Sequence, residues 1–148
     1  MERIVQEALA HHKEGGTLLT ILKEVQDKYA YLPQDAMIDI ARGLNIPTGE
    51  VYEVATFYSF LSKEPLGENI IRICKSTPCF LKNCETIVKT VEKELGISMG
   101  ETTDDGKFSL QLTNCIGACD MAPAMMINKR TYGNLTPDKI ARILSECE

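Results

Sequence analysis

The spacing of apolar residues divides the chain into a helical first half and a mixed second half. Through the first sixty residues, apolar positions recur every three or four residues, as they do on one face of a helix. Four such stretches are separated by Gly15-Gly16, Pro33 and Pro47, with Thr17 placed to cap the second and Leu44-Asn45 closing the third. Because the connections are short, we expect a compact helical bundle.

The second half follows a predicted linker at 61–69, which contains Pro65 and Gly67. Its apolar runs predict the order strand–helix–strand–strand–helix, with strands at 70–73, 108–112 and 124–127 and a turn at 128–134. We expect Asn83 to cap the first of these helices and Thr136-Pro137 to start the last. Helices that are connected to strands in this order are expected to cover a sheet, so we predict the α+β fold class. We place the helical bundle at 1–66 and the second domain at 67–148.

Four cysteines carry the most specific chemical signal. Cys74 and Cys79 form a C-x4-C pair, Cys115 and Cys119 form a C-x3-C pair, and 35 residues separate the pairs. Each pair follows a predicted strand, so the sheet can bring both loops to one end. Four thiolates on two loops suit a tetrahedral metal or an iron–sulfur cluster. The loops hold small and turn-forming residues, which let backbone N–H groups approach sulfur.

Disulfides, structural zinc and unrelated buried thiols are the alternatives. The chain opens without an apolar leader and has no run long enough to span a membrane, which predicts a cytoplasmic location where disulfides are rare. Both spacings are also acceptable for zinc, so spacing alone leaves zinc and a cluster open. Cys84 and Cys147 are not needed for a four-ligand site. We expect Cys84 to be a small buried residue, with a spare ligand as the alternative.

Residues 41–51 resemble a helix-turn-helix, which makes a redox-sensing transcription factor an alternative from another functional class. The second helix of this motif contains Glu50 and Glu53, and no Lys or Arg lies between Pro47 and Ser62. DNA binding requires cations that face phosphates. The formal net charge of the 148-residue chain is −5, which also disfavours a polyanionic partner. We therefore expect two packed helices and no nucleic-acid partner.

Several motifs together indicate a family. They are Leu32-Pro33, the segment VYEVATFYSF at 51–60, Cys74 and Cys79 with Pro78, the run CIGAC at 115–119, Ala122-Pro123 and Asn128. Through them nearly the whole chain resembles NuoE, the small [2Fe-2S] subunit of the flavoprotein module in NADH dehydrogenases. Relatives of NuoE occur in NAD-linked multisubunit hydrogenases and formate dehydrogenases.

The resemblance implies a helical bundle followed by a thioredoxin-like domain, with Cys74, Cys79, Cys115 and Cys119 as the ligands of one [2Fe-2S] cluster. It also implies two partners in one complex: a flavoprotein subunit that binds FMN and NAD(P)(H), and a larger iron–sulfur subunit. The absence of a long N-terminal extension favours a compact bacterial member, in a soluble hydrogenase (bifurcating or not) or a formate dehydrogenase, over a respiratory enzyme.

The chain contains no G-x-G-x-x-G loop and no persuasive nucleophile–base pair. We therefore expect hydride chemistry to belong to the partner, and this chain to exchange single electrons with the flavin without being catalytic alone. A stand-alone thioredoxin-like ferredoxin or redox sensor is the alternative. The bundle favours a subunit, because a free carrier needs only the cluster domain. The apolar residues Phe57, Tyr58, Phe60 and Leu61 either dock the partner or close the bundle against the second domain.

Overall fold

The computed structural model describes residues 2–12 and 15–147, with the backbone alone for Glu2 and His12. The chain forms two compact units, Met1–Pro65 and Leu66–Glu148. We call the first the helical unit and the second the sheet unit. Among the described residues, no helix is both long and apolar enough to cross a membrane.

The helical unit contains the four helices that the apolar spacing predicts. They are α1 (Glu2–His12), α2 (Leu18–Tyr29), α3 (Gln34–Leu44) and α4 (Thr48–Phe57). The Thr17 hydroxyl accepts a hydrogen bond from the Thr20 N–H, which confirms the predicted cap of α2. One apolar core joins all four helices, with Val5, Leu22, Ile40 and Val51 among its fully buried members. Burial of this shared core is the main source of the unit's stability.

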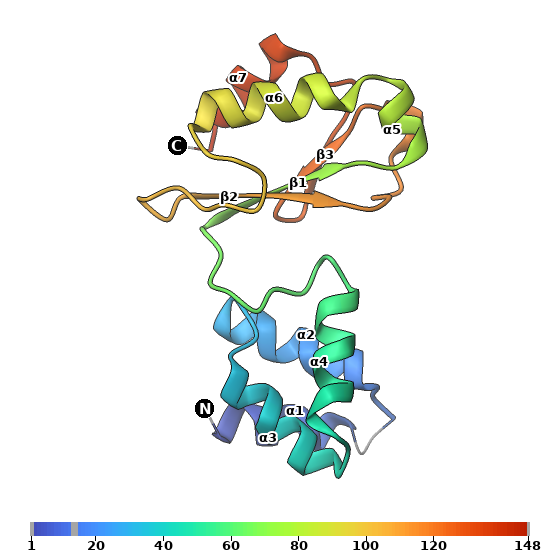
Figure 1. Ribbon diagram of the computed structural model, residues 1–148, viewed down its shortest axis with the longest axis vertical. Helices are drawn as coiled ribbons and strands as arrows, with labels where there is room; N and C mark the ends of the chain where they lie inside the picture. Colours follow the sequence, from blue (N-terminus) through green and yellow to red (C-terminus); the bar gives the residue numbers. More distant parts are fainter. Residues whose placement is uncertain (1, 13–14, 148) are drawn as a thin grey trace. The chain divides into compact units, whose positions relative to one another are not determined.

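The sheet unit is built on four strands in the order β2-β1-β3-β4. The strands are β1 (Asn69–Cys74), β2 (Phe108–Thr113), β3 (Met125–Ile127) and β4 (Arg130–Tyr132). Strands β1 and β2 are parallel, whereas β3 is antiparallel to both β1 and β4. Helices α6 (Cys84–Leu95) and α7 (Pro137–Ser145) lie on one face of the sheet (Figure 1) and share a buried core with Ile71, Ile73 and Leu110. The predicted α+β fold is confirmed.

Three short elements were not predicted from the sequence. They are α5 (Thr77–Leu81), which begins in the first cysteine loop and ends beyond Cys79, the 3-10 turn η1 (Cys119–Met121), which begins at the last cysteine of the second loop, and β4, inside the predicted turn at 128–134. Each spans five residues or fewer, which is too short for a periodic apolar pattern to develop. Asn83 precedes α6 as predicted, but its backbone is left-handed and its side chain makes no capping hydrogen bond.

Candidate iron–sulfur centre

The parallel pairing of β1 and β2 brings the two cysteine loops to the same edge of the sheet. Cys74, the last residue of β1, pairs in register with Thr113, the last residue of β2. Just beyond this pair, the Lys75 N–H donates to the Thr113 carbonyl at 3.0 Å. Because these two parallel strands end at the same paired residues, the chain leaves both strands at the same edge of the sheet. Cys115 follows two residues after Thr113. The expected meeting of the two loops is therefore observed.

In the first loop, Cys74 and Cys79 are both buried, and the Cys79 thiol donates a hydrogen bond to Cys74. The sulfur of Cys74 also accepts from the backbone N–H and the hydroxyl of Ser76. Cys79 is the buried residue of the short helix α5, and its sulfur accepts from the backbone N–H of Ala124, the residue before β3. These two thiols therefore lie side by side among backbone donors.

In the second loop, Cys115 and Cys119 are exposed, and their Sγ atoms are 3.6 Å apart. A tetrahedral metal with metal–sulfur bonds of about 2.3 Å places two thiolate ligands about 3.8 Å apart. The observed separation therefore suits two ligands of a single metal ion. The Gly117 N–H donates to Cys115 Sγ at 3.3 Å, and Gly117 has φ +77°, a conformation that is strained for residues with a side chain.

A hydrogen bond between the loops joins the two pairs, because the Ile116 N–H donates to the sulfur of Cys74. Within the described part of the chain, no group of three or more Cys, His, Asp or Glu side chains is close enough to hold a metal ion. The four thiols therefore form two pairs and not a closed set of four. Four thiolates in two pairs are the ligand set that a binuclear cluster takes, with two thiolates on each iron.

The environment of each thiol alters its acidity. Burial acts to raise the pKa of Cys74, but hydrogen bonds from Ser76, Cys79 and Ile116 outweigh it and the pKa falls below the ordinary value. Burial raises the pKa of Cys79 to about 11, with a further contribution from neighbouring Cys74. The hydrogen bond with Cys115 raises the pKa of Cys119, and negative charge on Cys115 raises it further. A thiolate therefore forms more easily at Cys74, where N–H donors converge, than at Cys79 or Cys119.

The sequence indicated that backbone N–H groups would approach sulfur, but it did not indicate which residues supply them. Ser76, Ile116 and Gly117 lie inside the cysteine loops, so their contribution was foreseeable in kind. Ala124 was missed, because the apolar pattern assigned it to a strand. The available signal was its place directly after Ala122-Pro123, where the chain turns back from the second loop into the sheet.

The remaining two cysteines occupy different surroundings. Cys84 is buried in the same apolar cluster as Cys74 and Cys79, together with Ala118 and Ala124. Cys147 is half-buried and packs against the core between the sheet and its helices. Cys84 is therefore buried at the helix start, as expected, and it is also next to two of the predicted ligands.

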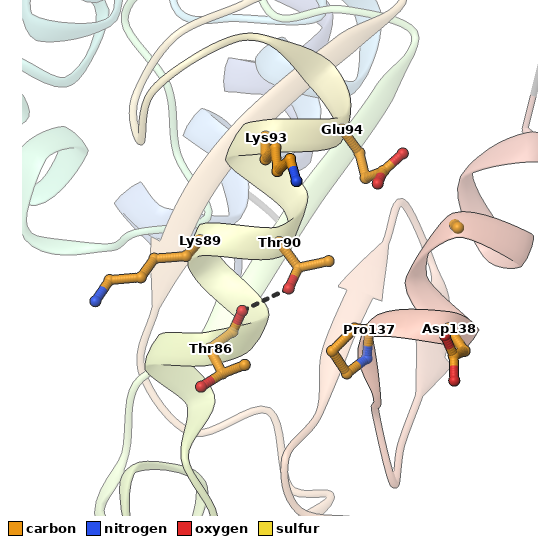
Figure 2. Close-up of a pocket in the computed structure, with 8 residues that line it drawn as sticks. Thr86, Lys89, Thr90, Lys93, Glu94, Pro137 and Asp138 are labelled. Atoms are coloured by element: carbon orange, nitrogen blue, oxygen red, sulfur yellow. Dashed lines mark hydrogen bonds between the residues drawn. The ribbon is translucent and has the colours of Figure 1, made fainter.

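A shallow groove lies between α6 and α7 in the sheet unit (Figure 2). It has a volume of about 420 Å³, and Lys89, Lys93, Glu94 and Asp138 line it with charges of both signs. Figure 2 shows the Thr90 hydroxyl donating to the Thr86 carbonyl within α6, at 2.7 Å. Among the described residues that line the groove, none is a predicted ligand. The groove is not part of the cysteine site.

Fold and site together define a thioredoxin-like protein with two cysteine pairs at one edge of its sheet. The family of thioredoxin-like [2Fe-2S] ferredoxins matches residues 2–148, and the chain belongs to this family. The resemblance to NuoE is confirmed by the corresponding component of NADH-quinone oxidoreductase from Pseudomonas aeruginosa, which is 41% identical over 145 residues, covering 97% of this chain and 87% of that protein.

Two further comparisons extend the range of relatives. The HndA component of an NADP-reducing hydrogenase from Solidesulfovibrio fructosivorans is 35% identical over 134 residues, covering 90% of this chain and 78% of that protein. The crystal structure of an NAD+-reducing [NiFe]-hydrogenase in the air-oxidized state aligns with a TM-score of 0.70 at 22% identity. It covers 85% of this chain and 22% of the hydrogenase chain, and at this identity it supports the fold alone.

We predict that the thiols of the metal-free chain differ in reactivity. Alkylation requires an accessible thiolate, so at pH 8 iodoacetamide should modify exposed Cys115 and Cys119 well before Cys79, whose pKa is about 11. The rate at Cys79 should keep rising up to about pH 11, as its thiolate forms. Mass spectrometry of peptides after timed alkylation measures each site. Equal rates at Cys79 and Cys115 at pH 8 would contradict the buried environment of Cys79.

Proposed function

We propose that this chain is an electron-transfer subunit that holds one [2Fe-2S] cluster on Cys74, Cys79, Cys115 and Cys119. In this proposal it exchanges single electrons with the flavin of an NAD(P)H-linked oxidoreductase complex. The complex is a soluble hydrogenase, a formate dehydrogenase or an NADH:quinone oxidoreductase. The FMN and NAD(P)(H) sites belong to a flavoprotein partner, and a larger iron–sulfur subunit completes the assembly.

The observation that carries the proposal is the convergence of two thiol pairs with backbone donors. N–H groups from Ser76, Ile116, Gly117 and Ala124 point at three of the four sulfurs. When bound, a [2Fe-2S] cluster supplies reversible one-electron transfer and gains negative charge on reduction. Burial disfavours that added charge, whereas N–H dipoles aimed at the sulfurs offset part of the cost. The chain therefore offers what a reducible cluster requires.

The second support is the kinship with subunits of larger enzymes. The Pseudomonas and Solidesulfovibrio relatives are named as subunits of NADH-quinone oxidoreductase and of NADP-reducing hydrogenase, and the first matches this chain through both of its units. The helical unit adds no cysteine to the site, because all six lie in the sheet unit. A carrier acting alone has no need of this unit, which favours a subunit over a stand-alone ferredoxin or sensor.

The end of the helical unit has the character of a docking surface. Tyr52, Phe57, Tyr58 and Phe60 are exposed, and we call them the aromatic patch. Phe57 is 79% exposed, and its ring meets the Tyr58 ring edge-on at 5.0 Å. Rigid aromatic side chains that remain exposed commonly anchor protein–protein interfaces. We propose that this patch docks the flavoprotein.

The cluster assignment predicts a specific composition and a specific mutational pattern. The purified chain should contain equal iron and acid-labile sulfide, about two of each per chain. Replacing Cys74, Cys115 or Cys119 by Ala should lower both severalfold, because a deleted thiolate leaves an iron short of a ligand. Cys147→Ala is the matched control and should keep full content. Metal analysis that finds one zinc and no sulfide would overturn the assignment.

The docking proposal predicts that Phe57→Ser weakens capture of the flavoprotein. An exposed anchor contributes little to the chain's own stability, but its loss from an interface should lower affinity about tenfold. The measurement compares how much flavoprotein co-purifies with tagged wild-type and variant chains. Gln6→Ser, at an exposed site on α1, is the control. Undiminished capture by Phe57→Ser would show that docking lies elsewhere, or that the patch serves contact within the chain.

A further inference from the structure

The position of Cys84 separates it from the other buried residues of its helix. Ile87 and Val91 of α6 belong to the core between the sheet and its helices. Cys84, only 5% exposed, belongs instead to the small buried cluster that contains Cys74 and Cys79. A fifth thiol therefore lies on the ligand side of α6, in the buried cluster that holds two of the predicted ligands.

The chain between Cys79 and Cys84 is held by backbone hydrogen bonds and not by buried side chains. The N–H groups of Phe80, Lys82 and Asn83 donate to carbonyls at positions 76–80. All four intervening residues, 80–83, are exposed, and Phe80 and Leu81 have their apolar side chains in solvent. Cys79 is the buried residue of α5, so loss of its side chain removes the main anchor of that five-residue helix. Because few of its side chains are buried, this segment can rearrange at a lower cost than the strands and helices of the core.

The first turn of α6 has no side-chain cap. A helix usually begins with a residue of extended backbone whose side chain caps an N–H of the first turn. Asn83 instead has φ 63°, a left-handed conformation, and its side chain makes no capping hydrogen bond. The start of α6, where Cys84 lies, therefore lacks a side-chain cap and is closed by one backbone hydrogen bond, from the Thr86 N–H to the Asn83 carbonyl at 3.2 Å.

We propose that Cys84 is a reserve ligand of the cluster, able to replace Cys79 when the sulfur of Cys79 is absent. The inference rests on the proposed function, since it assumes that the chain binds the cluster. In the exchange, the Cys84 thiol releases one proton to solvent as its sulfur binds iron at the position that Cys79 would occupy. The number of thiolate ligands stays at four, and neither oxidant nor reductant is required.

Proximity restricts the role to the first cysteine pair. Cys84 shares its buried cluster with Cys74 and Cys79, whereas Cys115 and Cys119 are exposed on the other loop. Of the first pair, Cys74 is fixed within the sheet as the last residue of β1, so its loss leaves a gap at a rigid position. Cys79 is followed directly by the exposed segment 80–83 and lies five residues before Cys84 along the chain. We therefore expect Cys84 to replace Cys79 and no other ligand.

The test is the iron and acid-labile sulfide content of full-length variants, with the visible circular dichroism spectrum of each. Cys79→Ala should retain cluster with an altered spectrum, and Cys79→Ala with Cys84→Ala should retain at least about fivefold less. Cys84→Ala alone should keep full content. Cys79→Ala with Cys147→Ala controls for the loss of a second thiol and should match Cys79→Ala. Removing Cys84 should change nothing further in a Cys115→Ala background.

Equal cluster content in Cys79→Ala and in its double variant with Cys84→Ala would overturn the proposal. If Cys79→Ala does not fold, Cys79→Ser is used, because serine keeps the side-chain size. The visible circular dichroism spectrum of Cys79→Ser is then compared with that of its double variant with Cys84→Ala. A spectrum that shifts when Cys84 is also removed supports the exchange, whereas an unchanged spectrum refutes it. Wild-type protein without iron and sulfide would instead refute the proposed function itself, so the two failures are distinguishable.

Discussion

The pairing of β1 with β2 is the constraint on which the site depends. The two cysteine pairs lie far apart in the sequence, and neither loop alone can supply four ligands. Parallel pairing in register, with Cys74 opposite Thr113, ends both strands at the same edge of the sheet. The core around Ile71, Ile73 and Leu110 fixes this register, because a slip by one residue would turn the buried side chains to the other face. Sheet packing therefore determines where the thiols meet.

The two cysteine loops supply most of the backbone hydrogen-bond donors that reach the sulfurs. Backbone N–H groups converge on sulfur because the chain turns tightly at Ser76 and Gly117, and because Ala124 returns beside Cys79 just before β3. These dipoles act on any negative charge placed at the sulfurs, and their contribution is large where water is excluded, as at Cys74 and Cys79. The second pair remains exposed, at the surface through which an electron partner can approach.

Much of this arrangement could be read from the sequence, for reasons that particular residues illustrate. Thr17, Pro33 and Pro47 act through local backbone chemistry, so the four helices were predictable. The ligand candidates followed from cysteine spacing, and the family from motifs such as CIGAC and Ala122-Pro123. The short elements α5 and β4 were not predictable, because their form depends on the loops and strands around them. The capping prediction failed at Asn83, where the chain takes a left-handed turn between two helices. The donation from Ala124 to Cys79 joins residues far apart in sequence, and only the folded sheet shows it.

The central claim is that two thiol pairs at one sheet edge hold a reducible binuclear cluster. A spectroelectrochemical titration of the purified chain tests it most directly. The account predicts one reversible wave with a slope of about 59 mV per decade, which is the value for a one-electron couple. Uptake should be one electron per about two irons, at a midpoint below about −150 mV, as expected for ligation by cysteine alone. A chain that takes up no electron in this range, or that contains zinc in place of iron and sulfide, would contradict the account.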